Sequence, residues 1–360
     1  MMTALRRGKP DRLPVTIHQW QQYHLATYMN GVDQLDAFRA AGLDASVTPF
    51  ETLSTAESPA WRTAIEDKGV RNGQRVRRYR VATPDGELTW EQATNEYTTF
   101  NTEHVIKHRA DAEMFLKHMP AGKLDKKLLS KWYDRTGDSG IVRLQVAAFA
   151  QPGPWQEFCE LAGTQQAIVW AMEEPEFVHF FLEEMTRYKI NFVHHEMAGA
   201  KIDLVEHGGG AASGNVISPA MFDEFCAPYD RRIIGALHEA GFLVVYHTCG
   251  GMMAILENIP ANGCDASETC SPPGVGGDIT TEKRPIVKKT LGSKVALIGG
   301  LDQSGILEQG TAAMVEQEVE SLFTTLGKGG GYICSASDHF FQAPLENLKA
   351  MARAGSRCAY

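Results

Sequence analysis

Three side chains in the second half of the chain could together bind a metal ion: His247, Cys249 and Cys334. The first two belong to a His-Thr-Cys segment that follows the apolar run 242–246, and the third ends another short apolar run. An imidazole and two thiolates suit Zn²⁺, which accepts nitrogen and sulfur ligands. Three protein ligands leave the fourth position of a tetrahedral ion open, which is typical of a catalytic zinc site rather than a structural one.

The same residue types also occur in proteins that bind no metal. Cysteine is among the most buried residue types, so each cysteine could be a small core residue, and the His-Thr-Cys segment could be a tight turn without a metal. Cys264 and Cys270 flank the segment 265–269, which is the sixth predicted strand, and could replace Cys334 as ligands. Cys334 ranks above them because it ends a predicted strand, whereas Cys264 precedes one and would face the opposite end of the fold.

The composition is that of a large globular protein. The chain has 360 residues, of which 43% are hydrophobic and 22% charged, and its net charge of −9 argues against nucleic acid as the main partner. The sequence shows neither an apolar run of the roughly 18 residues that a transmembrane helix needs nor a secretory signal. Seven dispersed cysteines are typical of reduced thiols, so we expect a cytoplasmic protein without membrane contact. The sequence leaves a homodimer open.

Eight short apolar runs alternate with amphipathic stretches along the chain. The predicted strands are 13–19, 43–49, 141–148, 202–206, 242–247, 265–269, 295–299 and 331–335. Most of these runs are continuous, which is typical of strands buried on both faces. Helical spacing recurs between them, for example over 174–196 and 218–240. We therefore predict an α/β fold, a single (β/α)₈ TIM-type barrel over residues 1–360.

One stretch, about 60–130, interrupts this alternation between the second and third strands. Residues 75–82 and 87–92 flank the segment Thr83-Pro-Asp-Gly86, which is a strong turn signal. We predict a β-hairpin followed by helices, inserted into the barrel and packed against it.

Polar residues fall at or just beyond the predicted strand ends, where barrels of this type gather their catalytic groups. These residues are His18 and Trp20, Gln145, Glu206 and His207, His247 and Cys249, Glu268, Cys334, and Asp338 with His339. Glu206 or Glu268 could take the fourth zinc position, hold His247 in one tautomer, or simply cap a helix, and we favour Glu268 as the metal residue. His207 or His339 could donate a proton to a leaving group.

Motifs in the same order along the chain resemble those of the uroporphyrinogen decarboxylase superfamily, and within it the zinc-dependent, corrinoid-linked methyltransferases. The segments that carry the resemblance are 10–15, 246–250, 262–266, 299–302, 310–311, 329–334 and 344–347. The resemblance spans most of the chain, is strongest in the second half, and implies His247, Cys249 and Cys334 as zinc ligands. Glu268 resembles a glutamate of the more distant cobalamin-independent methionine synthases.

One departure indicates the subgroup. True uroporphyrinogen decarboxylases carry an arginine-rich segment after the first strand, and residues 18–24 contain no arginine here. A substrate with eight carboxylates would lack its main counter-charges. Those decarboxylases also need no metal, so both observations favour methyl transfer over decarboxylation.

The resemblance implies a zinc-dependent methyltransferase that moves a methyl group between a small molecule and the cobalt of a corrinoid (cobalamin) on a partner protein. Because His18, Trp20, Tyr23 and Gln145 could form an aromatic, hydrogen-bonding substrate site, we expect O-demethylation of a methoxylated aromatic compound first. The aromatic residues could equally pack the loop. Transfer from methylcorrinoid to a thiol of the coenzyme M type comes second, and decarboxylation third. A barrel that only stores or senses zinc or corrinoid is the non-enzymatic alternative.

Overall fold

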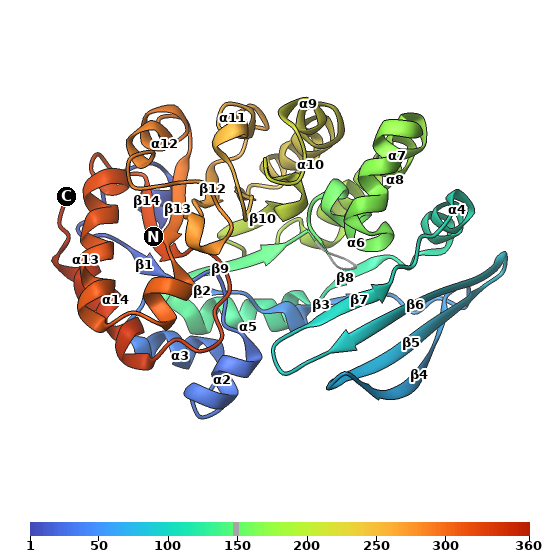
Figure 1. Cartoon of the computed structure of the whole chain (residues 1–360), viewed down its shortest axis with the longest axis horizontal. Helices are drawn as coiled ribbons and strands as arrows, with labels where there is room; N and C mark the ends of the chain where they lie inside the picture. The colour runs from blue at the N-terminus through green and yellow to red at the C-terminus, as the bar shows by residue number, and fades with distance from the viewer. Residues whose placement is uncertain (147–150) are drawn as a thin grey trace.

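Eight parallel strands form a barrel in the computed structural model, which describes residues 1–146 and 151–360 (Figure 1). They are β1 (Val15–Thr16), β2 (Ala45–Val47), β9 (Gly140–Gln145), β10 (Leu204–Gly208), β11 (Leu243–His247), β12 (Ala266–Thr269), β13 (Ala296–Leu301) and β14 (Tyr332–Ala336). Their order is β1-β14-β13-β12-β11-β10-β9-β2. A 2.9 Å hydrogen bond from the Asp44 amide to the Val15 carbonyl links the two ends of this series.

The predicted TIM-type barrel is therefore confirmed, and each of the eight predicted strands overlaps an observed one. The strand predicted over 141–148 ends at Gln145, and its residues 147–148 lie outside the described part of the chain.

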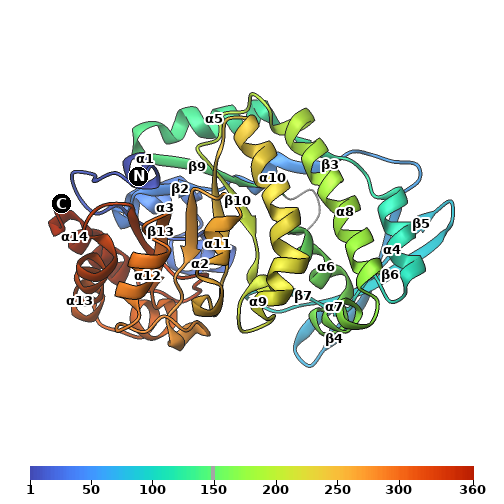
Figure 2. The same cartoon turned by 90° about the horizontal axis from the view of Figure 1, so that it is seen from above.

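Helices surround the barrel on its outer side (Figure 2). They are α2 (Gln22–Tyr28), α3 (Gln34–Ala41), α5 (Lys126–Thr136), α6 (Pro154–Ala162), α7 (Thr164–Glu173), α8 (Pro175–Phe192), α9 (Pro219–Met221), α10 (Ala227–Glu239), α11 (Asn258–Ala261), α12 (Arg284–Thr290), α13 (Ala312–Leu322) and α14 (Leu345–Arg357). Ser218 caps the N-terminus of α9, because its side chain accepts a hydrogen bond from the Met221 amide. Within the described residues, no helix has the length and apolar character needed to cross a membrane.

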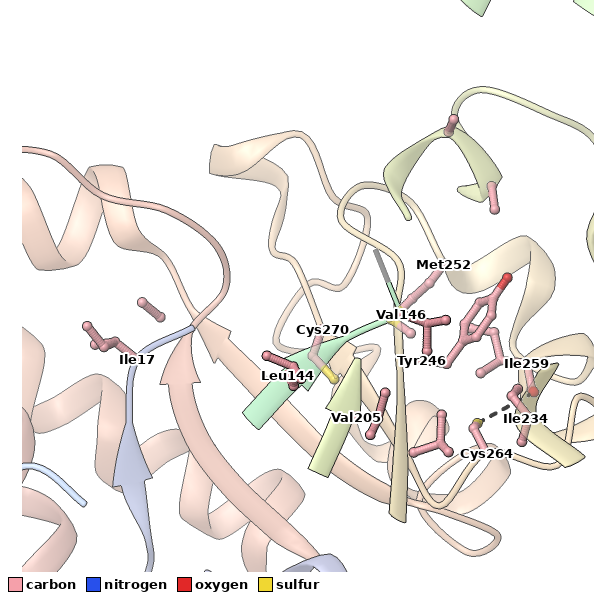
Figure 3. Close-up of a cluster of buried hydrophobic side chains, with 14 of the residues drawn as sticks. Ile17, Leu144, Val146, Val205, Ile234, Tyr246, Met252, Ile259, Cys264 and Cys270 are labelled. Atoms are coloured by element: carbon pink, nitrogen blue, oxygen red, sulfur yellow. Dashed lines mark hydrogen bonds between the residues drawn. The ribbon is translucent and has the colours of Figure 1, made fainter. Parts of the chain in front are cut away.

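Two hydrophobic cores result from the alternation of side chains along the strands. Inward-facing residues such as Ile141, Leu204 and Ile333 form a small core inside the barrel, closed at its base by the short helix α1 (Met2–Leu5). Outward-facing residues form a large core beneath the helices. Figure 3 shows part of this outer core, with Leu144 and Val205 on neighbouring strands.

The interruption between β2 and β9 contains an antiparallel sheet that extends to one side of the barrel (Figure 1). Its strands are β4 (Arg62–Arg71), β5 (Gln74–Thr83), β6 (Gly86–Thr94) and β7 (Thr99–Glu103), followed by α4 (Arg109–His118). A short pair, β3 (Leu53–Thr55) and β8 (Gly122–Leu124), lies beside the barrel mouth. The predicted hairpin corresponds to β5 and β6, on which the rings of Tyr79 and Trp90 stack at 4.9 Å.

Candidate active site at the barrel mouth

A buried arginine, Arg143, organises the inside of the barrel below the mouth. Its side chain is 3% exposed and lies between two carboxylates from other strands, Glu206 on β10 and Glu268 on β12. Its Nη2 and Nε donate to Glu206 Oε2 at 2.5 and 3.1 Å, and its Nη1 donates to Glu268 Oε2 at 2.9 Å. Nη2 also contacts Glu268 Oε1. The guanidinium therefore uses its donors to tie three strands together.

This arrangement keeps both carboxylates ionised. Burial alone would raise the pKa of Glu206, but the charges of Arg143 and His18 hold that pKa well below its ordinary value. The pKa of Glu268 is likewise lowered, against the effect of burial, by Arg143, His18 and His247. The pKa of Arg143 is raised, because its two carboxylate partners outweigh the effect of burial.

His247 ends β11 with its ring inside the barrel, and Glu268 fixes the orientation of that ring. The imidazole Nδ1 lies 2.9 Å from Glu268 Oε1, which leaves Nε2 as the nitrogen available to a ligand. Burial lowers the pKa of His247, but the neighbouring Cys249 and Glu268 raise it above its ordinary value overall. A carboxylate behind the ligating histidine is the usual support of a zinc site in proteins.

Cys249 reaches the same space from the loop after β11. Two backbone hydrogen bonds hold the base of this loop: Thr248 N donates to Glu268 O at 3.0 Å, and Gly209 N donates to His247 O at 2.8 Å. Gly210 makes room for the sulfur, because a Cβ at that position would lie 2.6 Å from Cys249 Sγ. The absence of a side chain at Gly210, after β10, thus leaves the space that the Cys249 side chain occupies.

Asp338 and His339, in the loop after β14, approach from the other side of the mouth. The His18 Nδ1 lies 3.8 Å from Asp338 Oδ1, and the rings of His18 and His339 lie 5.2 Å apart. The pKa of Asp338 is lowered, because His247 and His18 outweigh burial. Burial and the nearby His18 lower the pKa of His339 to about 4, which leaves its ring neutral at pH 7.

The polar side chains at the mouth open into a cavity of about 860 Å³. It is large enough for a small substrate, since ligand sites in proteins occupy about 300–1,000 Å³. Six of the predicted site residues line it: His18, Gln145, Glu206, His247, Cys249 and His339. The predicted clustering of polar groups at the carboxyl ends of the strands is therefore seen in the structure.

Cys334 does not lie with His247 and Cys249. On β14, Ile333 belongs to the core inside the barrel, whereas Cys334 belongs to the outer core and is fully buried there. Burial raises the pKa of the Cys334 thiol to about 12, as expected of a thiol among apolar side chains. The structure therefore does not assemble the predicted set of three ligands.

His207 also faces away from the mouth. Its Nε2 lies 2.8 Å from Asp230 Oδ1 on α10, and the Tyr246 hydroxyl donates to Asp230 Oδ2 at 2.6 Å. These three side chains form a buried network outside the barrel. The network attaches β10 and β11 to α10, which favours a structural role for His207 over proton transfer.

Two aromatic residues that follow the first strand, Trp20 and Tyr23, pack against side chains of other elements rather than line the cavity. Trp20 is 7% exposed and its ring contacts Phe38 and Phe340 at centroid distances of 5.5 and 5.9 Å. Tyr23 packs against Tyr97, with the ring centroids 4.8 Å apart. Neither Trp20 nor Tyr23 lies on the described wall of the cavity.

Three groups of side chains among the described residues could hold a metal ion, each with ligand atoms within 4.8 Å of one another. These groups are His18 with Glu206, His247 and Glu268; His18 with Asp338 and His339; and His247 with Cys249 and Asp338. The carboxylates of the first group already pair with Arg143. The third group offers a thiolate, an imidazole and a carboxylate, a donor set that suits zinc.

The sequence carries the signature of a known family. The model of the uroporphyrinogen decarboxylase (URO-D) family matches residues 141–357. The chain belongs to this family. The match begins at the strand that carries Arg143 and ends in the last helix, so it includes Cys249, Glu268 and most of the described site.

Relatives in this family have different activities. A methylated-thiol–coenzyme M methyltransferase from Methanosarcina mazei is 25% identical over 236 residues, which are 65% of this chain and 56% of that protein. A uroporphyrinogen decarboxylase from Sodalis glossinidius is 31% identical over 238 residues, which are 63% of this chain and 62% of that protein. The matched segments thus span less than two thirds of either relative.

A solved structure confirms the fold over the whole chain. A methyltransferase from Methanosarcina mazei superimposes with a TM-score of 0.64 at 15% identity, covering 99% of this chain and 96% of that one.

Arg143 was not predicted from the sequence, and Asp338 was given no role in the site. Arg143 lies inside the apolar run 141–148, where a charged residue is a visible sign of a buried ion pair. Asp338 follows the last strand beside His339, so its position marked it as a polar residue at a strand end, but no metal-binding role was predicted for it.

Proposed function

We propose that this protein is a zinc-dependent methyltransferase that moves a methyl group between a small substrate and the cobalt of a corrinoid on a partner protein. The observation that carries the proposal is the pair His247 and Cys249, which face one cavity at the barrel mouth. Membership of the URO-D family and the similarity to a methyltransferase within it support the same activity.

The side chains present fit a zinc ion at the mouth. His247 would bind through Nε2, since its Nδ1 is engaged with Glu268, and Cys249 would bind through its sulfur. We propose Asp338 as the third ligand in place of Cys334, because it lies within ligand distance of both. The cavity beside these three residues leaves room for a fourth ligand from the substrate.

When bound, zinc would stabilise a substrate sulfur as a thiolate, or polarise a substrate oxygen, at neutral pH. The other residues of the chain hold this arrangement in place. Glu268 orients the His247 ring, and Arg143 fixes Glu268 through two of its nitrogens. Gln145 donates from Nε2 to Glu206 Oε1 at 2.9 Å, which completes the polar floor of the cavity.

Among the methyl-transfer reactions, we favour one with a thiol or its methyl thioether as the small substrate. The expectation of a methoxylated aromatic depended in part on Trp20 and Tyr23, and these residues pack against aromatic side chains of other elements instead. The name of the methyltransferase relative, methylated-thiol–coenzyme M methyltransferase, specifies a methylated thiol. O-demethylation remains the second candidate, because Phe50 and His339 still offer two rings on the cavity wall.

Decarboxylation of a polycarboxylate is less compatible with the site. A substrate of that kind needs cationic side chains. Of the described residues that line the cavity none is a lysine or arginine, and Arg143 below it is already bonded to Glu206 and Glu268.

The test combines metal analysis with methyl transfer from methylcobalamin to a thiol, using free methylcobalamin as a stand-in for the partner protein. We expect about one zinc per chain in the wild-type protein, and loss of both zinc and transfer in Cys249→Ser. Cys334→Ser is the matched control, and it should keep both because Cys334 lies in the outer core. Zinc retained in Cys249→Ser, or lost equally in both variants, would contradict the proposed site.

A further inference from the structure

The charge of the cavity indicates which substrates it can accept. Arg143 is fully buried and is shared between Glu206 and Glu268, so its positive charge is already balanced by two negative ones. Asp338 adds a third carboxylate on the cavity wall, with a side chain that is 24% exposed.

A zinc ion does not reverse this balance. Zinc and Arg143 supply three positive charges, against four negative ones from the three carboxylates and the Cys249 thiolate. The charge of His18, which lies beside Glu206 and Asp338, adds one positive charge and leaves the site without a surplus of either sign. A substrate thiolate then brings one more negative charge, so the filled site holds no surplus positive charge for a second anionic group.

Apart from the residues around the metal-binding group, the described lining of the cavity is uncharged, with polar side chains beside apolar ones such as Phe50 and Leu53. Its walls carry hydroxyl and amide side chains from several elements: Gln19, Ser54, Thr55, Gln151, Gln156 and Thr164. Of the described residues that line the cavity, none is a lysine or arginine. These groups can donate and accept hydrogen bonds with a hydroxyl, amide or ammonium group, but they cannot neutralise a sulfonate or carboxylate.

We propose that the small substrate is a thiol, or its methyl thioether, whose tail is uncharged and polar or cationic rather than a carboxylate or sulfonate. This inference rests on the proposed function, because it assumes that the sulfur lies at the zinc between His247, Cys249 and Asp338. In a partly buried site, a like charge within about 10 Å weakens binding by about tenfold.

The experiment compares three thiols of equal chain length on protein loaded with Co²⁺ in place of zinc. The thiols are 2-mercaptoethanol, cysteamine and 2-mercaptoethanesulfonate, which carry neutral, cationic and anionic tails. Sulfur binding to Co²⁺ produces a charge-transfer absorption band, which gives an affinity for each thiol without any need for turnover. After correction for the thiolate fraction, we expect the sulfonate to bind about tenfold more weakly than 2-mercaptoethanol.

A variant tests the same point from the protein side. Thr55 is exposed on the short strand β3 and lines the cavity, so a longer side chain can be accommodated there. Thr55→Lys should strengthen binding of the sulfonate thiol severalfold and weaken binding of cysteamine. Thr55→Gln, of similar length and without charge, is the matched control and should leave the order of affinities unchanged.

The outcomes separate the two proposals. If the sulfonate thiol binds to wild-type protein as tightly as 2-mercaptoethanol, the charge inference is overturned and thiol binding at the metal still stands. If none of the three thiols changes the Co²⁺ spectrum, the thiol-dependent function and the inference drawn from it are both overturned.

Discussion

Replacement of Arg143 by methionine would leave two buried carboxylates without their cation. Removing one partner of a buried ion pair costs about 3–5 kcal/mol, and Arg143 serves two carboxylates from different strands. Protonation of a carboxyl group left without its cation limits this loss of stability, because the neutral form is less costly to bury. At pH 7, protonating a carboxyl group of ordinary pKa costs about 3.7 kcal/mol, and at pH 5 only about 1 kcal/mol.

The sign of the pH dependence follows from the direction of the pKa shifts. In the wild-type protein the pKa values of Glu206 and Glu268 are lowered. The stability that these carboxylates provide is therefore fully present at any pH above their pKa in the unfolded chain, and it is lost only as the pH falls through their pKa values in the folded protein. Between pH 7 and pH 5 this contribution is therefore constant. In Arg143→Met the pKa of at least one carboxyl group should instead be raised, and the variant should regain stability as the pH falls.

We expect Arg143→Met to lower the free energy of unfolding by about 3–5 kcal/mol at pH 7 and by about 1–2 kcal/mol at pH 5. The assay is urea unfolding of chelator-treated protein at both pH values. Arg284→Met is the control, because Arg284 pairs with Glu318, whose side chain is 23% exposed. The loss in free energy of unfolding should be smaller for this variant and the same at both pH values. A cost below about 1 kcal/mol for Arg143→Met, or an equal cost at both pH values, would refute the reasoning.

Three further variants test the site and its support. Gly210→Ala should displace the Cys249 sulfur and weaken zinc binding in a chelator competition, whereas Gly235→Ala, where a Cβ meets nothing within 4 Å, should leave zinc binding unchanged. Tyr246→Phe removes a donor to a buried carboxylate and should lower the free energy of unfolding by about 1–3 kcal/mol, with zinc content unchanged; loss of zinc would contradict its placement outside the mouth. Glu268→Gln should weaken zinc binding by about 10–100-fold in the same competition, since it supports the zinc-binding histidine, and wild-type affinity would remove Glu268 from that role.

The barrel was predictable from the sequence because its strands are buried on both faces. Runs such as 242–246 and 295–298 are continuously apolar, and turns and helices separate the strands along the chain. The same property hides which way each side chain points, since an apolar run offers no contrast between its two faces. Cys334 shows the result: it lies in a strand as predicted, but in the middle of β14 rather than at its end, and its side chain belongs to the outer core.

The site was predictable only where residue type and chain position agreed. His247 and Cys249 follow a strand within one short segment, so the structure necessarily brings them close together. Trp20 had the right position, but its partners Phe38 and Phe340 come from elements distant in the chain. Contacts of this kind depend on tertiary packing and leave no local signal.

The buried ion pairs of Arg143 with Glu206 and Glu268 have a consequence for how the metal centre would assemble. Both carboxylates are neutralised by a guanidinium that belongs to the chain, so they do not repel one another before an ion arrives. The protein should therefore be preorganised, with the same barrel in its apo and zinc-loaded forms, unlike small zinc domains that unfold without their ion. Zinc could then be removed and restored under native conditions, and the measured affinity would reflect coordination alone rather than coupled folding.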